Sequence, residues 1–87
     1  MVNKVIRSLS YYVQAIELDP ENMVYYNNKS AVYVEKQEFD EARKWSEKAV
    51  DVGRSNRADY TLIAKAYSRI ATTYEKEKNL EEGKFHN

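Results

Sequence analysis

The sequence predicts an all-α domain built from repeated helical hairpins, and three observations favour this class. Glycine occurs twice and proline once among 87 residues, which are too few chain breakers for a β protein with many turns. Apolar residues recur at spacings of three and four, the period of an amphipathic helix. Shifting the chain by 34 residues aligns "YYVQAIELD" with "WSEKAVDVG", and a fixed period of this length indicates stacked helical repeats.

The first two helices are predicted on either side of a chain break at Asp19-Pro20. The first covers residues 5–18, where apolar side chains follow the helical period. Asn22 is the N-cap expected for a second helix that continues to about Lys36. The positions that define the two periods are Leu9, Tyr12, Val13 and Ile16 in the first helix and Tyr26, Ala31 and Tyr33 in the second.

Three more helices are predicted after a tight turn at residues 36–38. The third covers about residues 39–52, and Gly53 is expected in the left-handed conformation that ends many helices. The fourth begins near Asn56 and stays helical for about twenty residues, because no glycine or proline interrupts it. Lys78-Asn79 is expected to form a turn before a fifth helix over residues 80–86. Ala42, Trp45, Ala49 and Val50 are expected to face inward from the third helix.

A second internal alignment sets the expected repeat boundaries. At an offset of 41, large positions of the second helix match large positions of the fourth, and small match small. The seven extra residues are two helical turns, which predicts a third repeat with an extended first helix. The chain is therefore expected to be one partial repeat domain: the second helix of repeat one (1–20), repeat two (21–53) and an extended, incomplete repeat three (54–87). Tyr26, Tyr33, Tyr67 and Tyr74 fall on matching packing positions and are expected in the core.

The period, the aromatic positions and the closing proline resemble the tetratricopeptide repeat (TPR). The stretch "GRSNRADYTLIAKAYSRIA" is similar to the middle TPR domain of the Hop-type stress-inducible co-chaperones, which organise heat-shock proteins 70 and 90. The resemblance implies an antiparallel helix–turn–helix solenoid fragment with a concave groove, acting as a co-chaperone adaptor in stress responses. Its groove would clamp the C-terminal Met-Glu-Glu-Val-Asp peptide of heat-shock protein 90. Counting back from Pro20 implies an N-terminally truncated domain that lacks two of the family's clamp residues.

The resemblance assigns the remaining clamp residues by position. The clamp amide falls on Asn28, and the clamp cations fall on Lys65 and Arg69; Glu35 matches a secondary contact further from the end of the peptide. Helical spacing supports the assignment, because Asn28 and Glu35 share one stripe while Lys65 and Arg69 share another. The planar fork of arginine and the point charge of lysine suit a carboxylate ligand.

Composition excludes several other functions. Fourteen basic and fourteen acidic side chains balance, so no overall field favours nucleic acid or an anionic membrane. Without cysteine there are no disulfides or thiolate sites, and the single His86 has no partners for a metal. No catalytic constellation, cofactor motif or membrane-length apolar run is present. We therefore expect a cytoplasmic binding module that is not an enzyme.

Three alternatives remain open at this stage. The tail can belong to heat-shock protein 70, or the domain to another clamp-bearing co-chaperone such as an immunophilin or a phosphatase. Alternatively, the clamp is incomplete and inactive, and the chain is an assembly module that self-associates through apolar faces at its two ends. The stripes expected on those faces are Leu9, Tyr12 and Ile16 at one end and Ile70, Tyr74 and Leu80 at the other.

Overall fold

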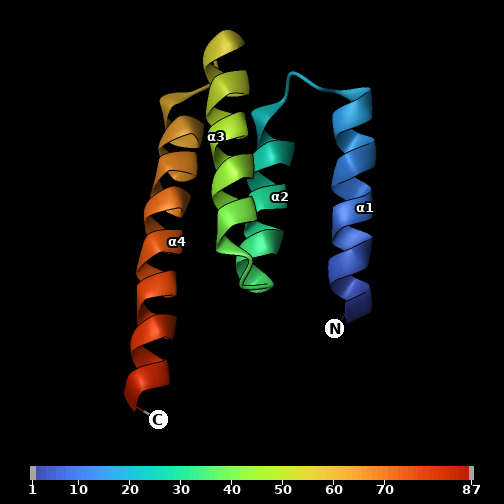
Figure 1. Ribbon diagram of the computed structural model, residues 1–87. Helices are drawn as coiled ribbons and strands as arrows, with labels where there is room; N and C mark the ends of the chain where they lie inside the picture. Colours follow the sequence, from blue (N-terminus) through green and yellow to red (C-terminus); the bar gives the residue numbers. More distant parts are fainter. Residues whose placement is uncertain (1, 87) are drawn as a thin grey trace.

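The computed structural model describes residues 2–86, with side chains from residue 4 to residue 83, and forms four antiparallel helices (Figure 1). α2 packs against α1 on one side and α3 on the other, and α4 packs against α3 and also touches α2. Residues 2–86 contain no strand, so the predicted all-α class is confirmed. The helices are α1 (Val2–Leu18), α2 (Met23–Glu35), α3 (Phe39–Ser55) and α4 (Tyr60–His86).

Local hydrogen bonds fix both ends of α2 as the sequence predicts. The Asn22 side chain accepts a hydrogen bond from the Val24 N–H at 3.0 Å, which is the expected N-cap. At the other end Gln37 adopts a left-handed φ of 61°, and the Glu38 N–H donates to the Tyr33 carbonyl at 2.9 Å. This pattern is a Schellman motif, and it turns the chain directly into α3.

The end of α3 differs from the prediction. Gly53 is buried inside the helix, and Arg57 instead takes the left-handed conformation, with φ of 57°. The Ala58 N–H closes this motif on the Gly53 carbonyl at 2.8 Å. Gly53 leaves room for the Met23 side chain, because a Cβ at position 53 would overlap the Met23 sulfur unless that side chain moved. α3 and the start of α2 therefore lie close together at Gly53.

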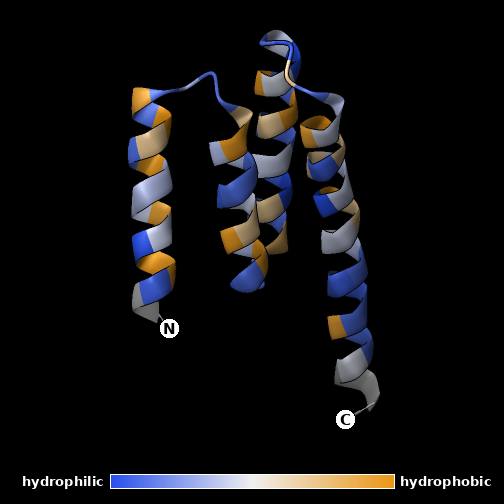
Figure 2. Cartoon of the chain, turned by 180° about the vertical axis from the view of Figure 1, so that it is seen from behind, coloured by the Kyte–Doolittle hydropathy of each residue, from blue (hydrophilic) through white to orange (hydrophobic). Residues whose placement is uncertain are grey.

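The predicted turn at Lys78-Asn79 is wrong, because α4 continues unbroken to His86 and the described residues form four helices rather than about five. Neither residue of that pair breaks a helix as glycine or proline would. The C-terminal end of α4 extends past the ends of α2 and α3 (Figure 1). This part is mostly hydrophilic (Figure 2). The start of α4 is also later than expected, at Tyr60.

The core lies where α2, α3 and α4 meet. Its buried apolar side chains come from all three helices, and Ile16 of α1 packs against them. Two buried serines are satisfied within it: the Ser30 and Ser46 hydroxyl oxygens lie 2.7 Å apart, and Ser30 donates to the Ala42 carbonyl at 2.6 Å. At this point of the core, α2 and α3 are joined by hydrogen bonds between small side chains rather than by the packing of larger ones. The buried cluster consists of Met23, Tyr26, Ala49, Val50 and Ala66.

The predicted core positions hold only in part on α2, where Tyr26 is buried but Ala31 and Tyr33 are partly exposed, and they fail on α4. On α4, Tyr67 is 46% exposed and Tyr74 is 59% exposed, although Arg54 and Arg43 of α3 contact them. The expected apolar stripe on α1 is also corrected: Leu9, Tyr12 and Ile16 are only partly exposed. The exposed large apolar residues of α1 are Ile6, Tyr11, Val13 and Leu18. On α4, Ile70 is partly buried, and Leu80 is exposed as expected.

Among the described residues, no helix combines the length and the apolar character that crossing a membrane would need.

Candidate functional site

A hollow of about 450 Å³ lies between α2 and α4. The α2–α3 hairpin and the following turn bring these two helices into contact although their sequences are about 40 residues apart. The predicted residues Asn28, Lys65 and Arg69 all line this first hollow. Its full lining is Asn27, Asn28, Ala31 and Val34 from α2 and Lys65, Ser68, Arg69 and Thr72 from α4.

Helical geometry explains which side chains reach the first hollow. Lys65 and Arg69 are four residues apart, so they project from the same side of α4. On α2, Asn28 and Ala31 are three residues apart and line the opposite wall. The small side chain of Ala31 leaves space between the walls. An arrangement of one amide and two cations around an open space can bind an anion.

Arg69 lines the first hollow and is anchored on α2. Its Nη1 donates to the main-chain carbonyl of Asn27 at 2.8 Å and to the Asn27 side-chain oxygen at 3.2 Å. Burial lowers the pKa of the Arg69 guanidinium, which nevertheless remains protonated at neutral pH. Asn27 is only 5% exposed. Sequence reasoning missed Asn27, because two adjacent asparagines give no signal of which one faces α4.

Neither cation of the first hollow is neutralised within the part of the chain whose side chains are described. No ion pair there involves Lys65 or Arg69, and the partners of Arg69 are an amide and a carbonyl. The side chains that line the hollow include no carboxylate. The first hollow therefore presents uncompensated positive charge, which attracts an anion from outside.

Glu35 lies apart from the other three predicted site residues. It lines a second hollow of about 520 Å³, together with Lys76 and Asn79. Val34 lines both hollows, so the second continues the first along the groove between α2 and α4. The apolar side chains of Val34, Phe39 and Leu80 are also part of this wall. A ligand bound in the first hollow can extend into the second.

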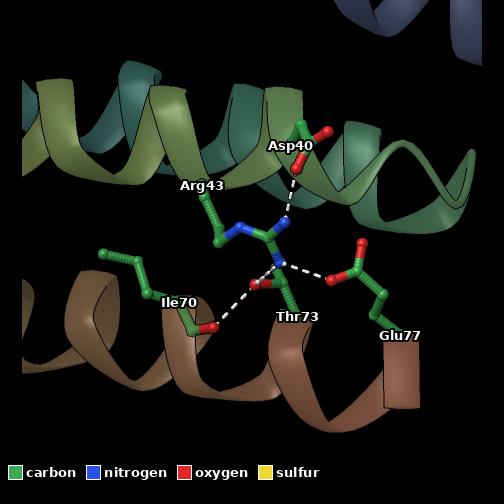
Figure 3. A network of polar contacts seen from close by, with 5 residues as sticks. All are labelled: Asp40, Arg43, Ile70, Thr73 and Glu77. Carbon is green, nitrogen blue, oxygen red and sulfur yellow. Dashed lines mark hydrogen bonds and ion pairs between the residues drawn. The ribbon is translucent and has the colours of Figure 1, made fainter. Parts of the chain in front are cut away.

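Another cation, Arg43, lies between α3 and α4, and it serves packing (Figure 3). Its guanidinium donates to the Thr73 hydroxyl at 3.2 Å, pairs with Glu77 at 3.4 Å and with Asp40, and stacks over the Tyr74 ring at 4.2 Å. Burial alone would lower the pKa of Arg43, but hydrogen bonds to Asp40 and Glu77 outweigh it, so the pKa is raised. With two carboxylate partners, this arginine has no charge left for a ligand.

The helical fold and its groove place the chain in a known class of repeat protein. The sequence profile described as the tetratricopeptide repeat matches residues 11–44, which run from the middle of α1 into α3. The four antiparallel helices agree with this class. The chain therefore has a TPR-like fold.

Comparison with known proteins narrows the class. The chain is 54% identical over 70 residues to Stress-induced-phosphoprotein 1 of Caenorhabditis elegans, covering 80% of the chain and 22% of the relative. It is 39% identical over 69 residues to the Hsp70-Hsp90 organizing protein of Triticum aestivum, covering 79% and 12%. A solved structure, the N-terminal domain of stress-induced protein-1 (STI-1) from C. elegans, superposes with a TM-score of 0.75 at 53% identity, covering 83% of the chain and 57% of that structure. The chain thus contains a TPR domain homologous to those of Hop/STI1 co-chaperones, and it spans less than a quarter of the two curated relatives.

Proposed function

We propose that this chain is the peptide-binding module of a co-chaperone adaptor, with no enzymatic activity of its own. Its ligand is the acidic C-terminal tail of heat-shock protein 90, which ends in Met-Glu-Glu-Val-Asp. The observation that carries the proposal is the first hollow, where Asn28, Lys65 and Arg69 converge with no carboxylate among the lining residues. The names of the relatives, which refer to Hsp70, Hsp90 and stress, support a chaperone partner.

The chemistry of the tail matches the first hollow. A terminal aspartate carries two carboxylates on one residue, and the first hollow offers two cations and an amide donor. Arg69 can engage a carboxylate through its planar fork, Lys65 adds a point charge, and Asn28 donates a neutral hydrogen bond. The preceding residues of the tail would then lie along the second hollow beside Glu35.

We also propose that this chain corresponds to the middle TPR domain of Hop-type proteins. The solved relative is an N-terminal domain, so the position of this chain within its relatives is part of what we propose. The tail of heat-shock protein 70 offers the same kind of carboxylate terminus to the same three residues. Cytoplasmic location follows from the proposed partner.

Calorimetric titration with the pentapeptide tests the proposal. We expect binding of the free-acid peptide and little or none of its C-terminal amide, which lacks the main-chain carboxylate. Arg69→Ala or Lys65→Ala removes a charge-assisted hydrogen bond of about 1.5–3 kcal/mol, which raises the Kd about 10- to 150-fold. Affinity should also fall as ionic strength rises.

Lys48→Ala is the matched control, because Lys48 is exposed on α3, away from both hollows, and carries the same charge. It should change the Kd less than twofold, since an exposed charge contributes little. Binding that survives both Lys65→Ala and Arg69→Ala would remove the clamp.

A second candidate function is self-assembly, favoured by one observation. Tyr60, Tyr67 and Tyr74 lie seven residues apart on α4 and are 89%, 46% and 59% exposed, which forms an aromatic stripe. Light scattering at several concentrations tests it. A dimer of constant mass that binds no pentapeptide would favour assembly over the clamp, whereas a monomer that binds the peptide would reject it.

A further inference from the structure

We propose that Asn27 is a positioning residue of the clamp, holding the Arg69 guanidinium in place for an incoming carboxylate. The inference rests on the proposed function and adds a residue that neither the clamp pattern nor helical spacing identifies. It is carried by two hydrogen bonds from one Arg69 nitrogen, at 2.8 Å and 3.2 Å, to two oxygens of Asn27.

These two contacts determine which part of Arg69 remains available. A guanidinium has five N–H donors, and two of them are on Nη1. The main-chain carbonyl and the side-chain oxygen of Asn27 occupy that nitrogen. Nε and Nη2 form no hydrogen bond with any other described residue. Three donors, including a parallel pair that fits a carboxylate, are therefore left for the ligand.

A neutral partner matters for this role. Asn27 fixes the guanidinium through an amide oxygen, which leaves the full positive charge of Arg69 in the first hollow. An aspartate at the same place would hold the side chain equally well but would cancel that charge. The Arg69 guanidinium thus has a fixed orientation and a positive charge that no neighbouring carboxylate neutralises.

Burial makes the anchor firm. Asn27 is 5% exposed, and a buried amide oxygen without a partner is costly, so its hydrogen bond to Arg69 favours a single orientation of both side chains. An arginine loses considerable rotamer freedom when it is fixed. Because folding has already fixed Arg69, peptide binding does not bear that cost again.

Peptide titrations of Asn27 variants test the inference. Asn27→Ala removes the side-chain contact but keeps the main-chain one, so we expect the Kd to rise about five- to tenfold, less than for Arg69→Ala. Asn27→Thr keeps an oxygen at this position and should recover part of the loss. Asn27→Asp should weaken binding at least as much as Arg69→Ala and flatten the salt dependence, without lowering the thermal unfolding temperature.

A double-mutant cycle separates positioning from a general structural effect. Because Asn27 acts through Arg69, Asn27→Ala should have no further effect in the Arg69→Ala background, where nuclear magnetic resonance can follow the weaker binding. Asn28→Ala is the matched control. Asn28 contacts the ligand directly, so its substitution should weaken binding in both backgrounds.

The possible failures are distinct. If Asn27→Ala binds the peptide like the wild type, or if its effect is undiminished in the Arg69→Ala background, the positioning role is overturned and the clamp stands. Tighter binding by Asn27→Asp would also overturn it. If Arg69→Ala itself binds normally, both the clamp and the positioning role fall.

Discussion

Two arginines connect neighbouring helices of this domain, and their partners differ in a way that separates structure from function. Arg43 reaches from α3 to α4, and Arg69 reaches from α4 to α2. Each uses Nη1 to donate across the helix interface. Arg43, however, meets the carboxylates of Asp40 and Glu77, whereas Arg69 meets only the neutral oxygens of Asn27.

The pKa values of the two groups shift in opposite directions for this reason. Burial disfavours the charged form in both, but the carboxylates around Arg43 outweigh that effect and raise its pKa. No carboxylate does so for Arg69, and burial lowers its pKa. A buried cation with carboxylate partners holds helices together, whereas one held by neutral groups keeps its charge for a ligand.

The largest effect expected from this comparison concerns stability. Arg43→Met should lower the free energy of unfolding by about 2 kcal/mol, because it removes hydrogen bonds between charged groups that join α3 to α4. Asp40 and Glu77 can still be hydrated, since 94% and 36% of their side-chain surface is exposed, which limits the loss. Urea unfolding followed by circular dichroism gives the value.

Arg69→Met is the matched control for that substitution. It should lower the unfolding free energy by about 1 kcal/mol, half the loss of the Arg43 variant, because it leaves two neutral oxygens of Asn27 without this partner rather than two carboxylates. Peptide binding should show the reverse order, with the Arg43 variant within about threefold of the wild type and the Arg69 variant strongly weakened. Equal loss of stability in both variants would show that the two arginines do not differ in role.

Much of the fold could be predicted from local sequence, because its determinants are local. Helical periodicity, the Asn22 cap and the turn at residues 36–38 depend on side chains a few positions apart. The predictions that failed concern where helices end, which single residues do not determine. α3 continues through Gly53 to Ser55, packed there against Met23, and α4 continues unbroken through Lys78-Asn79.

The residues of the candidate site also divide into those that could be predicted from the sequence and those that could not. Asn28, Lys65 and Arg69 could be named from a family pattern and from helical spacing, and the structure places all three on one hollow. Asn27 and Arg43 could not, because their partners lie 42 and 30 residues along the chain. Neither contact leaves a periodic signal in the sequence. The nearest indication of such a contact in a sequence is a polar residue at a position that the helical period predicts to be buried.

A third cation, Lys29, tests whether burial without a carboxylate is enough to define a binding site. Lys29 is 8% exposed, and its ammonium lies 3.7 Å from the centre of the Trp45 ring, which covers it. Because the Trp45 ring already occupies this ammonium, we expect packing rather than ligand binding. Lys29→Met keeps the length of the side chain and should raise the unfolding free energy by about 1 kcal/mol, as removal of a poorly paired buried charge often does.

The pH dependence sharpens this prediction. Burial lowers the pKa of Lys29 below its usual value of 10.5, with Lys44 acting in the same direction and Glu41 opposing it. Below the folded-state pKa the lysine is protonated in both states, so the full cost of burying the charge is present. As pH rises through the folded-state pKa toward 10.5, the folded lysine loses its proton first, and the cost decreases.

The advantage of Lys29→Met over the wild type should therefore shrink as pH approaches 10.5. Both chains carry the same tyrosines, so the difference between them isolates Lys29. Unfolding followed by the fluorescence of Trp45, the single tryptophan, provides the measurement. An advantage that grows with pH would mean that the Trp45 contact outweighs the cost of burial.

The smallest effect is expected at Glu35, which lines the second hollow rather than the first. If the tail runs from the first hollow into the second, Glu35 accepts a hydrogen bond from its upstream residues, a contact of about 0.5–1.5 kcal/mol. Glu35→Ala should then weaken pentapeptide binding about two- to tenfold, and Glu35→Gln, which keeps an acceptor oxygen, about twofold or less. Neither should alter binding of the dipeptide Val-Asp, which is too short to extend beyond the first hollow. An equal loss with both peptides would place Glu35 in the carboxylate clamp itself.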